Sequence, residues 1–264
     1  RTLGPMAVSR PTILIPSFNT GPLLLDTVEA ALATGYPVRV VIDGSTDGSE
    51  TLLEDLTATD NQLRVHILPQ NQGKGAAVLF GLEKSLEDGF THALAMDADG
   101  QHPADSVTAF LELSSRHPEA AIFGRPVFDD SAPALRVNGR KISNFWANLE
   151  TLGWGIDDSL FGMRLYPIRE LIETLEETRF ARRFDFDPEV AVRLAWKGVP
   201  IVNLPTPVRY IDPEDGGVSQ FRYLRDNTLL TWMHFRLMIG FLIRSPWLGM
   251  RGENPLLHLS PPAR

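Results

Sequence analysis

Residues 94–102 read Leu94-Ala95-Met96-Asp97-Ala98-Asp99-Gly100-Gln101-His102, an apolar run that ends in two carboxylates one residue apart. The run predicts a buried strand with Asp97 and Asp99 at its carboxyl end. Mg²⁺ and Mn²⁺ prefer oxygen ligands, and Mg²⁺ usually takes one or two carboxylates while water and phosphate oxygens complete its shell. Asp97 and Asp99 are therefore candidate ligands for a metal ion that carries a diphosphate.

The segments around this strand alternate between strand and helix patterns. Largely apolar runs at residues 12–16, 38–42 and 120–124 predict further strands, as does the stretch 63–68, with helical spacing of apolar residues between them. This order predicts a mainly parallel, doubly wound α/β sheet, which binds its ligands at the carboxyl ends of the strands. Asp43, Lys74 and Asp97 all follow such ends. Their common edge predicts one active site.

Lys74 belongs to the glycine-rich stretch Asn71-Gln72-Gly73-Lys74-Gly75, which opens a predicted helix through about Leu86. Backbone amides at a helix start can bind an anion, and Lys74 adds a positive charge. The stretch is not a P-loop, because Gly75 stands where that motif has Ser or Thr. No Gly-x-Gly-x-x-Gly follows the first strand, so a dinucleotide-binding fold is not predicted.

Composition narrows the classes of function. A net charge of −8 over 264 residues argues against a protein that follows nucleic-acid phosphates. The absence of cysteine excludes disulfides, thiolate zinc sites and a cysteine nucleophile, and fits a reducing compartment. With neither a signal peptide nor a long uninterrupted apolar run, the sequence favours a cytoplasmic location. We expect an arm at residues 1–10, native or added, a catalytic domain at 11–215 and an acceptor-side loop, helix and tail at 216–264.

Taken together, these motifs resemble family 2 of the glycosyltransferases, with the GT-A fold, and most closely its dolichyl-phosphate-sugar-synthase-like branch. The resemblance covers about residues 11–226 and rests on ordered motifs: Pro16-Ser17-Phe18-Asn19-Thr20, Val41-Ile42-Asp43-Gly44-Ser45-Thr46-Asp47, Asn71-Gln72-Gly73-Lys74-Gly75, Asp97-Ala98-Asp99-Gly100-Gln101-His102 and the segment from Asp158 to Arg164. It implies a Rossmann-like, mainly parallel sheet with a C-terminal helical extension. It also implies an inverting, metal-dependent transfer from a UDP- or GDP-sugar.

The resemblance also assigns residues to the donor site. Pro16, Phe18 and Asp43 would line the base and ribose pocket, and Lys74 would approach the nucleotide. Asp99, with Asp97 and Gln101, would hold Mg²⁺ or Mn²⁺ and the diphosphate. Two departures concern the base: Ile42 replaces the first of the family's paired aspartates, and Thr20 replaces its usual glutamate. The Gln-x-x-Arg-Trp signature of processive synthases is missing, as is the membrane-spanning tail of some relatives.

The acceptor side leaves two alternatives open. A hydroxyl acceptor needs a general base, and Asp158 is the candidate. A lipid phosphate is already ionised, and Arg140 and Arg164 are then candidate clamps, because guanidinium groups suit phosphate oxygens. We favour a lipid-linked acceptor. The altered Ile42-Asp43 pair also suggests a catalytically silent nucleotide-sugar binder, and Asp97-Ala98-Asp99-Gly100 resembles the nucleophile motif of haloacid-dehalogenase-like phosphatases.

The remaining expectations concern the C-terminal half. A stripe of Ile142, Phe145 and Leu149 predicts a helix over residues 140–152. Residues 221–250 mix large apolar side chains with Arg222, Arg225, Arg236 and Arg244, and Arg251 follows directly, which suits a helix at the surface of an anionic membrane. A helix that closes the sheet is the alternative. Arg182 and Arg183 are expected to pair with Asp185 and Asp187, and His102 and His234 to be structural.

Overall fold

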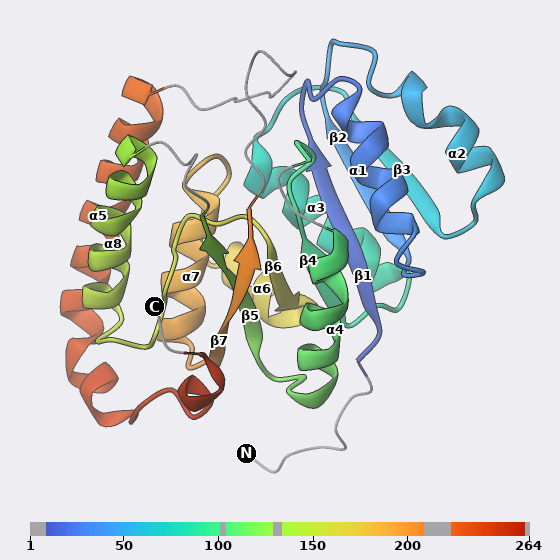
Figure 1. The fold of residues 1–264 in the computed structure, drawn as a ribbon. Coiled ribbons are helices and arrows are strands. Elements are labelled where there is room, and N and C mark those ends of the chain that lie inside the picture. Colours follow the sequence, from blue (N-terminus) through green and yellow to red (C-terminus); the bar gives the residue numbers. More distant parts are fainter. Residues whose placement is uncertain (1–8, 101–103, 129–133, 209–222, 262–264) are drawn as a thin grey trace.

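The computed structural model describes residues 9–100, 104–128, 134–208 and 223–261, which form a central sheet covered by helices on both faces (Figure 1). The sheet has seven strands in the order β3-β2-β1-β4-β6-β5-β7. All neighbouring strands pair in parallel except β6, which is antiparallel to β4 and β5. The strands are β1 (Pro11–Ser17), β2 (Val38–Asp43), β3 (Leu63–Leu68), β4 (His92–Ala95), β5 (Ala121–Val127), β6 (Arg164–Pro167) and β7 (Ile201–Pro207).

Eight α-helices lie in the described residues: α1 (Leu23–Leu32), α2 (Glu54–Thr59), α3 (Lys74–Glu87), α4 (Val107–Arg116), α5 (Ala134–Glu150), α6 (Ile168–Glu176), α7 (Phe186–Trp196) and α8 (Tyr223–Met250). Short 3₁₀ turns occupy Thr51–Leu53, Ala104–Ser106 and Leu257–Leu259. Helices α1 and α4 cover one face of the sheet, and α3, α6 and α7 cover the other. The observed architecture is therefore the mainly parallel, doubly wound α/β sheet that the alternating patterns predict.

The alternation of side chains in the central strand shows why both faces are closed. Ile13 and Ile15 of β1 belong to the core beneath α1 and α4, whereas Leu14 between them belongs to the core beneath α3 and α7. All three side chains are fully buried. A strand covered on both sides is apolar at most of its positions, which is the pattern of an interior parallel strand.

Element boundaries agree with the sequence for the first five strands and differ later. The predicted pair of strands at 201–204 and 208–210 is one strand, β7, and residues 209–210 lie outside the described part of the chain. Helix α6 had no counterpart among the predicted elements. The predicted 140–152 helix begins earlier, at Ala134, and ends at Glu150. The proposed boundary at 215–216 also falls outside the described residues.

Helix α8 packs against α5 and α7, and the turn Leu257–Leu259 packs against β7, so the C-terminal extension lies on the body of the domain. Figure 1 shows α5 and α8 side by side at one end of the sheet, opposite the end formed by β3. Within the described residues, no helix combines the length and apolar character that a membrane span requires.

Candidate active site

Lys74 pairs with two carboxylates at the carboxyl edge of the sheet. Its Nζ is 2.8 Å from Asp97 Oδ1 and 2.7 Å from Asp187 Oδ2. Asp97 lies two residues beyond the end of β4, Lys74 is the first residue of α3, and Asp187 lies in the first turn of α7. The prediction that Lys74 and Asp97 meet at one edge is thus confirmed.

The two carboxylates set the charge state of Lys74. Burial by itself lowers the pKa of this ammonium, but Asp187 and Asp97 together outweigh burial and hold the pKa above its ordinary value. Lys74 is therefore protonated across the physiological range. A fixed cation between two carboxylates is suited to contact the diphosphate of a nucleotide.

Three glycines allow the segments around Lys74 to approach one another. A Cβ on Gly162 would lie 2.3 Å from Asp97 Oδ2 and 2.8 Å from Lys74 Nζ. A Cβ on Gly75 would lie 2.0 Å from the carbonyl oxygen of Ala181. Gly73 combines a φ of +101° with similarly close backbone contact. The Gly-Lys-Gly pattern therefore serves close packing against residues 181–183.

This packing also corrects the expectation for the start of α3. The amide of Gly75 donates to the carbonyl oxygen of Arg182 at 3.0 Å, and the amide of Ala76 contacts the same oxygen and that of Gly73. Because these carbonyls already accept the amides of Gly75 and Ala76, those two amides are not free to bind an anion. The Lys74 side chain carries a positive charge toward the site.

Asp43 holds the same loop from the side of β2. Its carboxylate accepts hydrogen bonds from the amides of Gln72 (2.9 Å) and Gly73 (2.7 Å) and from the side-chain nitrogen of Asn71 (3.1 Å). Burial raises the pKa of Asp43 above its ordinary value, although the two amides oppose that shift. Only 2% of the surface of Asp43 is exposed, and its carboxylate fixes residues 71–73.

Hydrogen bonds join the loop after β1 to the loop after β2. Pro16 is buried in β1, and Phe18 just beyond it is half-buried. The amide of Asn19 donates to Ser45 Oγ at 3.0 Å, and the amide of Thr46 donates back to Asn19 Oδ1 at 2.8 Å. These cross-links hold both loops beside the predicted base pocket. The roles of Pro16 and Phe18 in that pocket stay predictions.

The predicted metal ligands lie at the same edge. Asp97 keeps 32% of its side chain exposed beside Lys74, and Asp99 is half-buried. Two partly exposed carboxylates fit a hard divalent cation whose shell is completed by phosphate and water. Gln101 lies outside the described residues. Within the described ranges, no three acidic or histidine side chains gather into a metal-binding group.

On the acceptor side, Asp158 and Arg140 form an ion pair. Arg140 Nη1 lies 2.8 Å from Asp158 Oδ1, and the same oxygen accepts the amides of Leu160 (2.9 Å) and Phe161 (2.7 Å). Only 4% of Asp158 is exposed, whereas the Arg140 side chain keeps 21% of its surface exposed. The carboxylate therefore fixes the turn at 158–161.

Arg164 does not reach an acceptor. Its side chain is fully buried, and its guanidinium donates to the carbonyl oxygens of Asp187 (2.6 Å) and Asp158 (3.0 Å) while it stacks on the ring of Phe123. This geometry contradicts the expectation that Arg164 clamps a phosphate. A fully buried guanidinium that donates to two carbonyl oxygens positions the segments around it.

The expected partners of Asp185 and Asp187 were also wrong. Arg182 donates to the carbonyl oxygens of Leu175, Thr178 and Phe180, and Asp185 accepts the amides of Ala181 and Arg183. Lys74 is the cation that pairs with Asp187.

The sequence profile described as glycosyl transferase family 2 matches residues 12–174. The chain belongs to this family. That range carries β1 to β6 and every described candidate residue except Asp187, so most of the candidate site of this glycosyltransferase lies within the part of the chain that the family profile matches. The membership removes the basis of the phosphatase alternative.

Two curated relatives are similar over most of this glycosyltransferase. Polyprenol monophosphomannose synthase of Mycolicibacterium smegmatis is 30% identical over 212 residues, which cover 75% of this chain and 78% of the relative. Glycosyltransferase AglJ of Haloferax volcanii is 29% identical over 225 residues, which cover 83% and 68%. Such relatives agree with the dolichyl-phosphate-sugar-synthase-like branch.

Solved structures share the GT-A fold. Glucosyl-3-phosphoglycerate synthase of Mycobacterium tuberculosis, in complex with Mn²⁺, UDP-glucose and phosphoglyceric acid, superimposes with a TM-score of 0.62 at 14% identity, covering 88% of this chain and 79% of that one. Mannosyltransferase PcManGT of Pyrobaculum calidifontis, in complex with GDP-mannose and Mn²⁺, gives 0.59 at 19% identity, covering 95% and 68%.

Sequence reasoning missed Asp187 and Gly162 as site residues of the glycosyltransferase. Asp187 is 113 residues from Lys74, and its second carboxylate oxygen, Oδ1, is buried without a hydrogen-bond partner. The only signal was its place in an acidic stretch that opens a helix. For Gly162, the signal was a lone glycine six residues after Ile156 and two before a buried strand.

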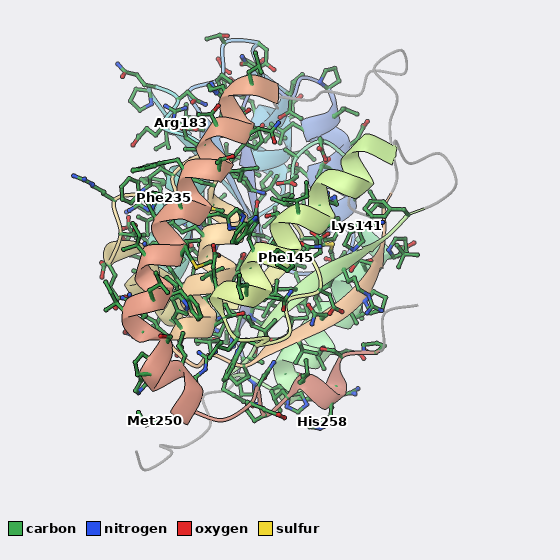
Figure 2. All side chains as sticks on the ribbon, turned by 90° about the vertical axis from the view of Figure 1, so that its left-hand side faces the viewer. Lys141, Phe145, Arg183, Phe235, Met250 and His258 are labelled. Atoms are coloured by element: carbon green, nitrogen blue, oxygen red, sulfur yellow. The ribbon has the colours of Figure 1, made fainter. Side chains whose placement is uncertain are left out.

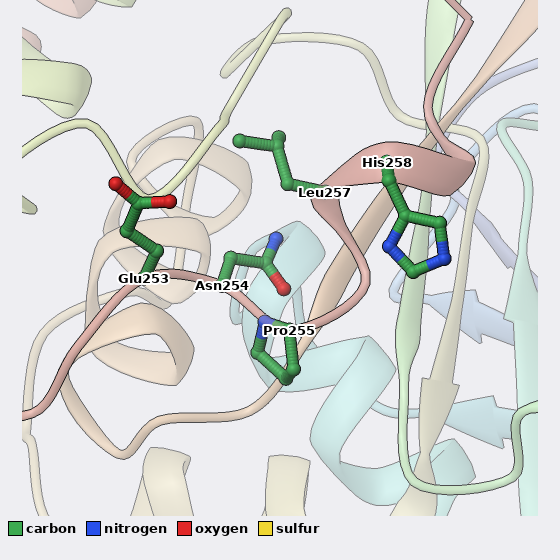
Figure 3. A pocket seen from close by; sticks show the side chains of 5 residues that line it. All are labelled: Glu253, Asn254, Pro255, Leu257 and His258. Atoms are coloured by element: carbon green, nitrogen blue, oxygen red, sulfur yellow. The ribbon is translucent and has the colours of Figure 1, made fainter.

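A hollow elsewhere on the glycosyltransferase is not this site. Figure 3 shows it, lined by Glu253, Asn254, Pro255, Leu257 and His258. Asn254 Nδ2 donates to the carbonyl oxygen of Ile201 at 2.7 Å, and Ile201 begins β7. Because β7 runs parallel to β5, the hollow lies at the amino edge of the sheet, away from Asp97 and Lys74.

Proposed function

We propose that this protein is an inverting, metal-dependent glycosyltransferase that moves a sugar from a UDP- or GDP-sugar to a polyprenyl phosphate. The observation that carries the donor half is the Asp97–Lys74–Asp187 group beside Asp99, at the carboxyl edge where such sheets bind ligands. The similarity to a polyprenol monophosphomannose synthase supports the lipid acceptor.

On the donor side, each residue has a separate task. Asp97 and Asp99 would hold Mg²⁺ or Mn²⁺, which supplies charge neutralisation for the departing diphosphate. Lys74 adds a second positive charge that stays fixed, because Asp187 holds its ammonium at 2.7 Å. Asp43 keeps the loop that carries Lys74 in place through the amides of Gln72 and Gly73.

On the acceptor side, the geometry favours a phosphate over a hydroxyl group. A hydroxyl acceptor needs a carboxylate ready to accept a proton. One oxygen of Asp158 already accepts Arg140 and two amides, and the residue is almost fully buried. A phosphate acceptor is ionised and needs a cation, and the partly exposed Arg140 suits that need.

The test measures release of nucleoside diphosphate from a panel of UDP- and GDP-sugars, with polyprenyl phosphate present or absent and with Mn²⁺ or chelator. We expect release that needs both metal and acceptor, and Asp99→Ala is expected to abolish release and the Mn²⁺-dependent thermal shift while the protein still folds. Full release in excess chelator would contradict metal dependence. Binding of a nucleotide sugar with no release would identify a silent binder.

Two variants separate the acceptor classes. With a phosphate acceptor, Arg140→Ala raises the KM for the acceptor, and Asp158→Asn changes kcat by less than about tenfold because Asn still accepts the two amides. With a hydroxyl acceptor, Asp158→Asn lowers kcat by about 10²-fold or more while acceptor binding changes little. A membrane lipid as acceptor also requires the enzyme to work at a bilayer surface.

A further inference from the structure

Helices α5 and α8 present a large apolar surface to solvent. The described residues include sixteen exposed large apolar side chains, and twelve of them lie on these two helices: Ile142, Phe145, Trp146, Leu149, Leu224, Trp232, Phe235, Ile239, Leu242, Ile243, Trp247 and Met250. Figure 2 views this side of the molecule, with Phe145 and Phe235 on neighbouring helices. We call these twelve residues the α5–α8 face. Apolar surfaces of this extent mark interaction sites.

Both helices are apolar on their inner side as well. On α8, Met233, Leu237 and Leu248 are buried against the core, while Leu242 and Ile243 are 63% and 73% exposed. A helix on the surface of a soluble domain normally has polar residues on its outer side. Here the outer side is apolar although the helix already has a core contact, so the fold itself does not account for it.

The exposed charged side chains in the described parts of α5 and α8 are all basic. The only acids of the two helices are Glu150 and Asp226, and both are fully buried. Lys141, Arg225 and Arg244 are exposed basic residues on the same helices, although Arg225 pairs with the buried Asp226 at 2.8 Å and Arg244 lies over the ring of Trp196. By sequence, α5 and α8 each carry three basic residues and one acid, so together they contribute +4 to a chain whose total is −8.

Two of the arginines on which the sequence-based expectation of membrane contact rests bind within the domain instead. Arg236 pairs with the buried Glu189 at 2.9 Å and lies over the ring of Phe180, and Arg251 donates to the carbonyl oxygens of Ala195 and Thr151. These arginines hold α8 and the segment after it to the domain. The attraction for anions comes instead from the exposed basic residues and from the absence of exposed acids among the described side chains of both helices.

We propose that the α5–α8 face is the surface by which this enzyme docks on an anionic bilayer. Helices with an apolar side and flanking basic residues lie in the interface plane of such membranes. A second copy of the chain fits less well, because pairing the same face would bring two positively charged surfaces together. The proposal deepens the proposed function, since it names the surface that brings the enzyme to its lipid.

The position of α5 connects this face to the acceptor side. Its outer side contributes Phe145, while Arg140 on the same helix pairs with Asp158 and the Asn144 side chain accepts the Ser159 amide at 2.8 Å. Docking through α5 therefore places the 158–161 turn next to the lipid headgroups. The face and the turn share one rigid helix.

The test is flotation of the purified protein with vesicles of phosphatidylcholine, with or without phosphatidylglycerol, at low and high salt. Wild type is expected to float with the phosphatidylglycerol vesicles and less at high salt. Phe145→Glu on α5 and Ile243→Glu on α8 are each expected to lower vesicle partitioning by about tenfold or more, since each removes one large apolar side chain that would insert into the bilayer. Thermal unfolding checks that both variants fold.

Ile67→Glu is the matched control. Ile67 is 60% exposed, close to the 62% of Phe145, but it lies on β3 at the opposite edge of the sheet. This variant is expected to float like wild type. Wild type that stays unbound, or equal loss for Ile67→Glu, overturns the proposal.

Sedimentation of the protein alone provides the test against a second copy. If the wild type is a dimer and Phe145→Glu is a monomer, a second copy of the chain, and not a bilayer, covers the α5–α8 face. Flotation needs no sugar transfer, so an absent transferase activity with normal flotation contradicts the proposed function and leaves this inference standing.

Discussion

The contact between Gly162 and Asp97 allows a direct test of the donor site. Adding one methyl group in Gly162→Ala places a Cβ 2.3 Å from Asp97 Oδ2. Ordinary van der Waals contact begins near 3.4 Å, so the Asp97 carboxylate must move by about 1 Å. Lys74 Nζ, at 2.8 Å from the same Cβ, has to move as well. The substitution therefore displaces the Asp97 carboxylate, which we propose binds the metal, together with the Lys74 ammonium.

The expected loss is larger in activity than in stability. A misplacement of about 1 Å at a reacting centre can lower the rate by about 10²-fold. Overpacking of a core costs about 1–3 kcal/mol, and we expect the lower end because the Asp97 side chain is 32% exposed and has room to move. Initial rates of nucleoside diphosphate release and urea denaturation measure the two quantities on the same preparation.

Gly249→Ala is the matched control for this prediction. A Cβ at Gly249, near the end of α8, meets nothing within 4 Å. Its activity should equal that of wild type, and its free energy of unfolding should rise by up to about 1 kcal/mol because Ala favours the helix. If Gly162→Ala retains wild-type rates and Mn²⁺ affinity, the Asp97–Lys74 geometry does not control the donor site.

Three further predictions concern charges. Lys74→Met leaves Asp187 buried without its cation, which should lower stability by about 3 kcal/mol in urea denaturation. The variant should also bind the nucleotide donor more weakly in titration. Unchanged donor binding would exclude Lys74 from the site. His234→Ala leaves the fully buried Glu150 without its 3.0 Å partner. Because burial raises the pKa of Glu150, the loss of stability relative to wild type should be small below the ordinary pKa of a glutamate and should grow as pH rises through the folded pKa. A loss of stability that is the same at every pH, measured by denaturation, would refute this. Burial lowers the pKa of His92. The folded protein should therefore lose stability as pH drops below about 6.5, the pKa of a histidine in the unfolded chain. His92→Gln should flatten that decline relative to wild type.

The sequence predicts what depends on local pattern. Apolar runs located β1, β2, β4 and β5, because strands buried on both faces show little alternation. The edge strand β3 alternates apolar Leu63, Val65 and Ile67 with polar residues instead. The parallel order of those strands then placed Lys74 and Asp97 at one edge, and their 2.8 Å contact agrees. Both inferences need only chain order and the direction of neighbouring strands.

The sequence does not predict what depends on distant packing. Asp187 pairs with a lysine 113 residues away, and no periodicity signals that contact. The stripe on α5 that includes Phe145 looks like a core face in sequence, yet it is exposed, because the inner side of the helix already packs through Ala147. Apolar spacing identifies a helix and its stripe, but it does not tell which neighbour, if any, covers the stripe.

The burial of Arg164 explains how the two halves of the site stay in register. Its guanidinium donates to the carbonyl oxygen of Asp158 on the acceptor side and to that of Asp187 on the donor side. Asp187 in turn holds Lys74, and Lys74 holds Asp97. A planar guanidinium can reach two carbonyls at fixed directions, whereas an ammonium cannot impose that geometry. Arg164 thus fixes the distance between the turn that we propose faces the acceptor and the carboxylates that we propose face the donor.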